Sequence, residues 1–362
     1  HSDHCFIITN FVNLSEESKM ALQATRYIIY EHDHKYIKNR NPALYPNFRA
    51  PYTEVVNHKF YHNALAVFCQ TTFHARIVRM NTGHKNILTV GGNLWSEESL
   101  KIMEEYSEKE KADSCSVLNS HILHKGTSDA IRFCKDNELP YDLVASNIHT
   151  EFLTKLGCNK SFVFFPKTPE TLCRVVCEAR MMGMKVITNN LVGATKEKWF
   201  GLKGKPLIEV MRKKRDEICD LVEDTFQGTL NPDKFLFLQE RLVSVVVPAY
   251  NDEKYIAEAL DDLLAQTYSN LEIIIVDDGS TDNTTKICKE YANRYNFISF
   301  YKKINGGTGS ALNYGFKRAK GYYGTWVSSD DRRSPTSIEK LVVAIKENSV
   351  DLAFGAYHSE RF

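Results

Sequence analysis

Apolar and polar positions alternate in blocks along the last third of the chain. Runs rich in apolar residues have the pattern of buried strands at LVSVVVPAY (242–250), LEIIIVDDG (271–279), FISFYKK (297–303) and YYGTWVSS (322–329). Between the first two runs, apolar side chains recur at helical spacing from Ile256 to Leu264. Strands that alternate with helices predict a parallel sheet covered by helices on both faces. One more strand is predicted at DLAFGAY (351–357).

Two weaker alternations precede this region. Residues 1–80 contain three strand-like runs and are predicted to form an α/β layer domain whose front is missing: CFIITNF (5–11), RYIIYEH (26–32) and ALAVFCQT (64–71). Residues 84–200 predict a second such domain, with NILTVGG (86–92) as a strand and PETLCRVVCEARMMG (169–183) as a helix opened by Pro169. Residues 201–240 are highly charged and predict a helix followed by a connector, with the domain boundary near 235–241. The whole chain is predicted to be α/β.

Charge and composition narrow the range of functions. Lys plus Arg is 46 and Asp plus Glu is 45, so no excess of positive charge points to nucleic acid as a partner. No apolar run approaches the roughly 20 residues that span a bilayer, and the N-terminus does not have the pattern of a signal peptide. Nine scattered cysteines predict reduced thiols in a cytoplasmic protein. Association with the inner face of a membrane stays open. Because the chain lacks an initiator Met and stops after a strand-like run, we expect a fragment of a longer protein.

Polar residues follow each predicted strand of the last region. The clusters are Tyr250 with Asn251, Asp277 with Asp278, Asn305 with Gly306, and Asp330 with Asp331. The carboxyl ends of parallel strands meet at one edge of a sheet, and ligands bind there. Paired carboxylates at that edge suit Mn²⁺ or Mg²⁺ bound together with a nucleoside diphosphate. The alternative for Asp330 and Asp331 is a capping cluster before a helix that starts near Pro335.

These residues carry a resemblance to a known family. The segment VSVVVPAYNDEKYIAEALDDLLAQTYSNLEIIIVDDGSTDNT (243–284) resembles the start of family 2 glycosyltransferases, which are inverting enzymes of the GT-A fold. NGGTGSALNYG (305–315) is similar to the family's N-x-G-x-x-x-A-x-N-x-G segment, and VSSDD (327–331) stands where its D-x-D metal motif belongs.

The resemblance implies a role for each polar cluster. Tyr250 would stack on the base, and Asp278, supported by Asp277, would bind uracil. Asp330 would contact the ribose or the sugar, and Asp331 would ligate Mn²⁺ or Mg²⁺. Many members have an acid where this chain has Ser328, which leaves Asp331 as the expected metal ligand. The general base that deprotonates the acceptor is expected beyond residue 362, so this chain should bind donor and transfer poorly.

A second, weaker resemblance covers residues 1–200. PETLCRVVCEARMMG contains Glu170 and Glu178 and resembles the E-x7-E region of family 4 glycosyltransferases, which are retaining enzymes of the GT-B fold. It implies that Glu170 approaches the donor sugar and Glu178 binds ribose. HKGTSDAIRFCKDN (124–137) would supply Lys125 for the diphosphate, and IIYEHDHKY (28–36) would supply His32 on the acceptor side.

Two departures from that family pattern leave alternatives open. Ser120 replaces its arginine, and Thr171-Leu172-Cys173 replaces its Gly-Phe-Gly. Residues 1–200 are therefore either an active module or a degenerate module that is structural or presents the acceptor.

The sequence as a whole predicts part of a two-module glycosyltransferase of the hexosyltransferase type. A GT-B-like pair of Rossmann-type domains, the first one partial, occupies residues 1–80 and 84–200. A helical linker (201–240) and a GT-A nucleotide-sugar-binding domain (242–362) follow. The expected partners are a nucleotide-sugar donor, with UDP as the nucleotide, and a glycan or lipid-linked acceptor, as in polysaccharide assembly. The alternatives are a non-catalytic binding module, which would bind glycan without nucleotide, and a nucleotidyltransferase, which would release pyrophosphate.

Overall fold

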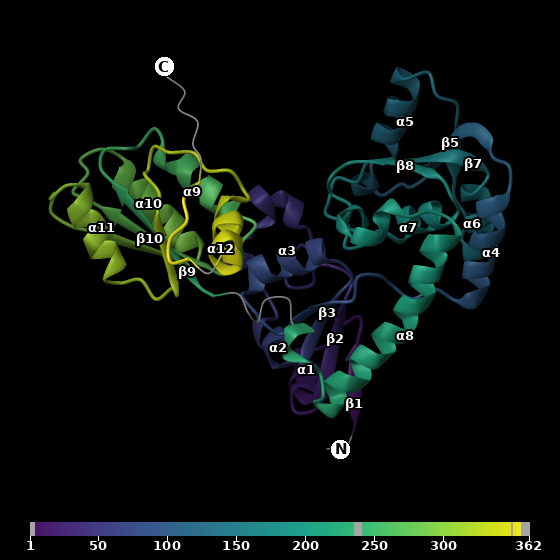
Figure 1. Ribbon diagram of the computed structural model, residues 1–362, viewed down its shortest axis with the longest axis horizontal. Coiled ribbons are helices and arrows are strands. Elements are labelled where there is room, and N and C mark those ends of the chain that lie inside the picture. The colour runs from purple at the N-terminus through teal and green to yellow at the C-terminus, as the bar shows by residue number, and fades with distance from the viewer. Residues whose placement is uncertain (1–3, 235–240, 349, 356–362) are drawn as a thin grey trace. The chain divides into compact units, whose positions relative to one another are not determined.

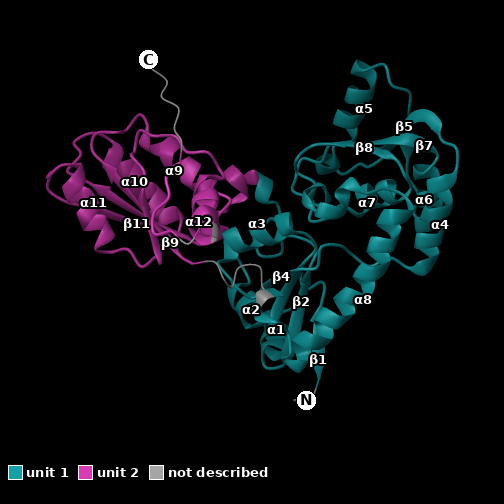
Figure 2. Cartoon of the chain, viewed as in Figure 1, with its two compact units in different colours: residues 1–43, 56–238 teal, residues 44–55, 239–362 magenta. Residues whose placement is uncertain are grey.

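The computed structural model describes residues 4–234, 241–348 and 350–355. The chain divides into two compact units (Figure 2): residues 1–43 with 56–238 form unit 1, and residues 44–55 with 239–362 form unit 2. The described strands form three parallel sheets of four strands each (Figure 1). These sheets, with helices between their strands, confirm the α/β class that the alternating pattern predicted.

The first sheet of unit 1 has the strand order β1-β2-β3-β4. Its strands are β1 (Cys5–Ile8), β2 (Arg26–Glu31), β3 (Ala66–Cys69) and β4 (Ile87–Thr89), and its helices are α1 (Glu16–Gln23), α2 (His58–Asn63) and α3 (Thr72–Thr82). All of β3 is buried, as its continuous apolar run requires. β4 lies in NILTVGG (86–92), which the sequence pattern assigns to the domain of residues 84–200. In the structure Ile87 pairs with Val67 of β3, because the apolar residues of this strand complete the core of the first sheet.

The second sheet of unit 1 has the order β6-β5-β7-β8. Its strands are β5 (Ala112–Leu118), β6 (Tyr141–Val144), β7 (Asn159–Phe164) and β8 (Lys185–Thr188), and its helices are α4 (Glu97–Glu108), α5 (Thr127–Asp136), α6 (His149–Leu156) and α7 (Arg174–Met181). The short 3₁₀ helices of unit 1 are η4 (Leu123–Lys125), η5 (Gly193–Lys196), η6 (Lys198–Gly201) and η7 (Pro232–Lys234). One more, η1 (Pro42–Leu44), ends where unit 2 begins.

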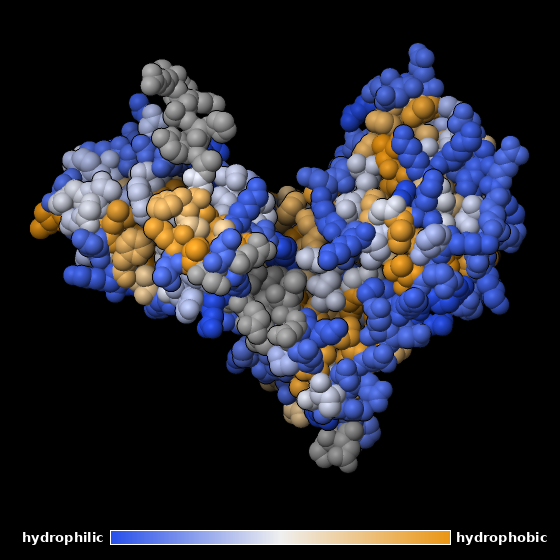
Figure 3. All heavy atoms as spheres, in the orientation of Figure 1, coloured by the Kyte–Doolittle hydropathy of each residue, from blue (hydrophilic) through white to orange (hydrophobic). Residues whose placement is uncertain are grey.

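Helix α8 (Lys205–Gln227) contributes to both cores of unit 1. Near its start, Leu207 and Met211 pack into the core of the second sheet. Near its end, Ile218 packs into the core of the first sheet. On the face drawn in Figure 3, hydrophilic side chains cover most of α4 and α8. An amphipathic helix that supplies apolar residues to two sheets joins them into one compact unit.

The sheet of unit 2 has the order β11-β10-β9-β12. Its strands are β9 (Val243–Ala249), β10 (Leu271–Asp277), β11 (Ile298–Lys302) and β12 (Tyr323–Trp326), and its helices are α9 (Ile256–Leu264), α10 (Thr284–Arg294), α11 (Thr308–Phe316) and α12 (Ser337–Asn348). Alternate residues of β9 face opposite sides. Val245 and Val247 pack with Leu260 of α9, whereas Val246 packs with Ala311 of α11. Helices on both faces explain why β9 is buried throughout.

A segment distant in the sequence completes unit 2. Residues 44–55 contain η2 (Pro46–Phe48) and η3 (Tyr52–Glu54), and η2 contacts α9. The guanidinium carbon of Arg49 lies 4.4 Å from the centre of the Phe297 ring, and Arg49 is only 2% exposed. The fold of unit 2 therefore includes residues far outside its continuous stretch of sequence.

Two predicted elements are wrong in their position or type. The helix expected from Pro169 begins at Arg174 instead, because Cys173 has a left-handed backbone (φ 71°) that a helix cannot continue through. Glu170 pairs with Val192 in an isolated β-bridge and does not lie at a helix start. Residues 351–355 contain no strand, and the rest of the predicted strand, 356–357, lies outside the described residues.

Candidate functional site

The carboxyl ends of three strands of unit 2 are in register. Asp277, the last residue of β10, is paired with Ala249 at the end of β9 and with Lys302 at the end of β11. The residues that follow these strands, Tyr250, Asp278 and Lys303, therefore leave the sheet at one edge.

Asp277 supports the turn that follows β10. Its buried carboxylate accepts hydrogen bonds from the Ser280 N–H at 2.7 Å and from the Thr285 hydroxyl, and Lys302 Nζ lies 3.4 Å away. Burial alone would raise the pKa of Asp277, but these bonds outweigh it and hold the pKa below its usual value. Asp277 is therefore an anion fixed beneath the edge of the sheet.

Asp278 lies in a cradle made by the loop after β11. Its carboxylate accepts hydrogen bonds from the N–H groups of Gly306, at 3.1 Å, and Gly307, at 2.7 Å, and from the Lys303 ammonium. Burial would raise the pKa of Asp278, and the bonds from Lys303 and the two glycines lower it below its usual value. The carboxylate is thus held ionised and in a fixed orientation.

The loop after β9 is fixed by polar contacts to its neighbours. Asn251 has a left-handed backbone (φ 56°), and its side-chain oxygen accepts a hydrogen bond from the Thr281 N–H at 2.8 Å. Asp252 Oδ2 accepts bonds from the Tyr250 N–H at 2.9 Å and from the Ser329 hydroxyl. The ring of Tyr250 is left 48% exposed on this edge, where a planar base could stack on it.

Asp330 and Asp331 lie in an exposed turn after β12. The next residue, Arg332, is held by the carboxylate of Asp262 through Nε at 2.7 Å and Nη2 at 3.0 Å. Helix α12 begins only at Ser337, so the two aspartates do not cap it. Within the described ranges of the chain, neither carboxylate forms a salt bridge, and no group of three or more His, Cys, Asp or Glu side chains could hold a metal ion.

This acidic turn fits a hard cation that is only partly held by protein. Mg²⁺ and Mn²⁺ accept one or two carboxylates and take their other ligands from phosphate oxygens and water. Asp331 and Asp330 offer two such carboxylates on an exposed turn. The same turn is joined to the loop after β9 through the bond between Ser329 and Asp252.

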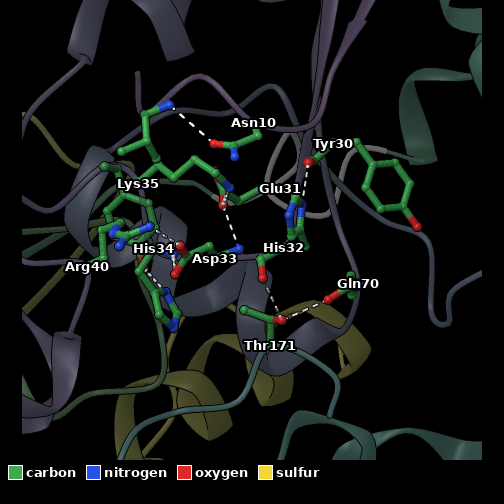
Figure 4. A network of polar contacts seen from close by, with 12 residues as sticks. Asn10, Tyr30, Glu31, His32, Asp33, His34, Lys35, Arg40, Gln70 and Thr171 are labelled. Atoms are coloured by element: carbon green, nitrogen blue, oxygen red, sulfur yellow. Dashed lines mark hydrogen bonds and ion pairs between the residues drawn. The ribbon is translucent and has the colours of Figure 1, made fainter. Parts of the chain in front are cut away.

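In unit 1, three of the predicted residues line one cavity. Lys125 Nζ forms a salt bridge of 2.7 Å with Glu170 Oε1, and both residues line a cavity of about 380 Å³ together with His32. Figure 4 shows His32 in a polar network in which the Thr171 hydroxyl donates to Gln70 Oε1 at 2.7 Å. The structure therefore brings together residues from the loop after β2, from η4 and from the segment before α7.

Glu178 lies away from that group, in the first turns of α7. It is 2% exposed, and its Oε1 accepts a hydrogen bond from Trp95 Nε1 at 3.1 Å. His149 Nε2 lies 3.1 Å from the same oxygen. Arg174 Nε also lies 3.7 Å from this oxygen, so the Glu178 carboxylate already has three partners inside unit 1.

Three residues of the edge in unit 2 were not singled out from the sequence: Asp252, Lys303 and Ser329. Lys303 directly follows β11 and Asp252 lies three residues after β9, so the rule that located Asp278 could have located them too. Ser329 had no such signal, because its partner Asp252 is 77 residues away.

Residues 244–361 match the family model described as "Glycosyl transferase family 2". This C-terminal region therefore has the sequence pattern of family 2 glycosyltransferases. The match does not extend to residues 1–243. It agrees with the first resemblance and leaves the family 4 resemblance of residues 1–200 without support.

Several curated proteins and solved structures are similar over part of the chain. Glycosyltransferase GlyG of Streptococcus pneumoniae is 44% identical over 119 residues, which are 33% of this chain and 40% of GlyG. An uncharacterized glycosyltransferase of Rickettsia conorii, RC0461, is 43% identical over 133 residues, 36% of this chain and 22% of that protein. The crystal structure of S. aureus TarS 1–349 in complex with UDP-GlcNAc is 36% identical, covers 30% of this chain and 32% of TarS 1–349, and has a TM-score of 0.28. The chain spans less than half the length of the relatives it matches.

No helix among the described residues has both the length and the apolar character needed to cross a membrane.

Proposed function

We propose that unit 2 binds a nucleotide-sugar donor, with uridine diphosphate as its nucleotide, at the carboxyl edge of its sheet. The observation that carries this proposal is the convergence of Tyr250, Asp278 and the turn of Asp330 and Asp331 on that edge. Tyr250 stacks on the base and Asp278 binds it, while Asp277 fixes the turn from which Asp278 projects. The family 2 match of residues 244–361 supports the same assignment.

Asp331 is the proposed ligand of Mn²⁺ or Mg²⁺, and Asp330 contacts the ribose or the sugar. A bound divalent cation would neutralise negative charge on the leaving diphosphate. The protein contributes the exposed carboxylates and holds their turn through Ser329 and Asp252.

The reaction proposed for the C-terminal module is inverting transfer of the sugar to a hydroxyl of a glycan or lipid-linked acceptor. Inversion requires a general base that takes the proton from the attacking hydroxyl. Donor binding precedes this transfer and can be tested by itself.

Calorimetric titration of UDP into the chain tests donor binding. With Mn²⁺ present we expect saturable binding at one site, and replacement of Mn²⁺ by EDTA should weaken it at least about tenfold, since the cation bridges carboxylate and diphosphate. Equal affinity with and without EDTA would contradict the metal assignment. Binding of a glycan with no binding of any nucleotide would favour the non-catalytic alternative, and release of pyrophosphate from a nucleoside triphosphate would favour the nucleotidyltransferase.

For unit 1 we propose a second anionic-ligand site at His32, Lys125 and Glu170, as the family 4 resemblance implies. The salt bridge between Lys125 and Glu170 beside a cavity supports it, because the ammonium can pair with a phosphate in place of the carboxylate. Glu178, whose Oε1 is bonded to Trp95, would have to bind ribose through its other carboxylate oxygen. A titration of UDP into Lys125→Met, with unit 2 blocked by Asp278→Asn, tests this second site. Equal residual binding with and without Lys125 would favour a degenerate module.

A further inference from the structure

The ammonium of Lys303 covers the carboxylate of Asp278 at the edge of the sheet. The two side chains form a salt bridge in which Lys303 is 16% exposed and Asp278 is 4% exposed. Lys303 Nζ also donates a hydrogen bond to the carbonyl oxygen of Ile304 at 2.6 Å. An ammonium has three donor hydrogens, so one donor remains for a ligand.

The acceptor positions of Asp278 are nearly all in use. An ionised carboxylate has about four acceptor positions. Lys303 takes one on Oδ1, Gly307 takes one on Oδ2, and the N–H of Gly306 is shared between both oxygens at 3.1 Å. Asp278 can therefore accept one additional donor and has no room for two.

Access to Asp278 also passes Lys303. Since the Asp278 side chain is 4% exposed and Lys303 lies against it, a base that reaches the carboxylate must come within reach of the ammonium. Lys303 Nζ lies close to the backbone of Gly306, since a Cβ added there would lie 3.1 Å from it. Ile304 and Tyr250, which are 90% and 48% exposed, offer apolar surface on the same edge.

We propose that Lys303 and Asp278 together read the hydrogen-bonding edge of the base and select uracil, an inference that rests on the nucleotide-binding function proposed for unit 2. Uracil presents one donor, N3–H, beside a carbonyl acceptor. The donor meets the last acceptor position of Asp278, and the carbonyl accepts from the free donor of Lys303. Each contact then joins a donor to an acceptor. Asp278 and Lys303 are both ionised, and hydrogen bonds to ionised groups are strong.

The other bases mismatch this pair in different ways. Cytosine has an acceptor at N3 and an amino group at C4. Its N3 acceptor would face the carboxylate of Asp278, and its amino donor would face the ammonium of Lys303. Adenine has the same order of groups at N1 and its amino group. Guanine has a suitable carbonyl but presents two adjacent donors to a carboxylate that can accept only one. A site built from buried hydrogen-bonding groups rejects ligands that leave those groups unpaired.

A purely structural role for Lys303 makes a different prediction. If the ammonium only holds the loop of Gly306 and Gly307 in place, its removal should weaken binding of every nucleotide by the same factor. If it reads the base, its removal should weaken UDP much more than CDP. The ratio of the two affinities therefore separates the two roles.

The test is calorimetric titration of UDP, CDP, GDP and ADP, each with Mn²⁺, into the native chain and three variants. Lys303→Met removes the ammonium at similar length, Lys303→Arg keeps a cation, and Lys320→Met makes the same charge change before β12, at the opposite end of the sheet. We expect the native chain to bind UDP at least about tenfold more tightly than CDP, as one matched pair of base contacts provides. Lys303→Met should bring this ratio close to one, Lys303→Arg should retain most of it, and Lys320→Met should leave it unchanged.

Two outcomes overturn the proposal. If Lys303→Met weakens UDP and CDP by the same factor, the ratio of their affinities is unchanged, and Lys303 serves the loop structure alone. If the native chain binds all four nucleotides equally, no base is selected and the inference fails while the donor site stands. If it binds none of them, the proposed function itself fails. Circular dichroism of each variant, with Lys303→Gln as a replacement should Lys303→Met not fold, keeps the comparison between folded proteins.

Discussion

The hydroxyl of Ser329 donates a hydrogen bond to Oδ2 of Asp252 and so ties the end of β12 to the loop after β9. This bond fixes the turn of Asp330 and Asp331 relative to Tyr250, whose N–H bonds to the same oxygen. Ser329→Ala should therefore weaken Mn²⁺-dependent UDP binding about fivefold, the size of one typical hydrogen bond. Calorimetry measures the effect. Ser328→Ala, one residue earlier, is the control and should bind UDP like the native chain.

Gly126 is a position where a side chain has no room. Its φ is 66°, and a Cβ added there would lie 1.8 Å from the carbonyl oxygen of Phe165. Gly228 has a similar φ of 75° with nothing within 4 Å of an added Cβ. Gly228→Ala should cost about 1 kcal/mol of unfolding free energy through backbone strain alone. Gly126→Ala should cost at least about 2 kcal/mol more, because the backbone must also shift. Urea unfolding, followed by the fluorescence of Trp95 and Trp199, compares the two variants. Equal losses of unfolding free energy would show that the backbone shifts without cost and relieves the contact with Phe165.

The pair of His149 and Glu178 should make the stability of unit 1 depend on pH. The hydrogen bond to Glu178 raises the pKa of His149 above its ordinary value of 6.5, against the effects of partial burial and of Arg174. Nδ1 of the same ring lies 3.4 Å from the Ser99 hydroxyl. A histidine whose pKa is raised by folding stabilises the folded state fully below its unfolded pKa. That contribution is lost as the pH rises through the folded pKa.

His149→Gln provides the measurement for this pair. The unfolding free energy of the native chain should exceed that of the variant at pH 5.5, and the difference should shrink as the pH passes above 6.5. A difference that stays constant from pH 5.5 to pH 8.5 would mean that the bond between His149 and Glu178 does not depend on protonation.

Arg49 fills a buried position in unit 2 without full hydrogen bonding. Among the described residues, its Nε and Nη1 atoms have no hydrogen-bond partner, and burial lowers its pKa to about 10. Arg49→Ala should lower the unfolding free energy of unit 2 by about 2–4 kcal/mol because it leaves a cavity beside Phe297. Arg49→Met should cost far less, since it fills similar space and buries no charge. Unfolding followed by Trp326 fluorescence separates the two, and an equal loss would assign the stability to the charge instead of the packing.

Local patterns predicted the sheet of unit 2 because each strand carries its own signal. β9 and β10 are short, mostly apolar runs, and Ile256 and Leu260 repeat at helical spacing between them. The edge rule then placed Asp278 beside Tyr250 without knowledge of any long-range contact. Elements whose limits depend on one backbone angle were predicted less well, as the start of α7 at Arg174 shows.

Contacts between distant residues were beyond what the pattern could predict. Nothing local shows that residues 44–55 pack in unit 2, because Arg49 meets Phe297 across 248 positions. The hydrogen-bond partners of Glu178 are Trp95 and His149, which are 83 and 29 residues away. Because these contacts leave no local signal, the spacing of Glu178 from Glu170 suggested a ligand role instead. Lys303 carried no motif of its own, and only the folded loop brings it onto Asp278.

The most direct test of the donor site is anomalous diffraction from crystals of the chain grown with UDP and Mn²⁺. We expect a manganese peak in unit 2 between the UDP phosphates and the carboxylate of Asp331, with the base beside Tyr250 and Asp278. Bound UDP with no manganese at Asp330 or Asp331, or UDP found only at Lys125 and Glu170 in unit 1, would contradict it.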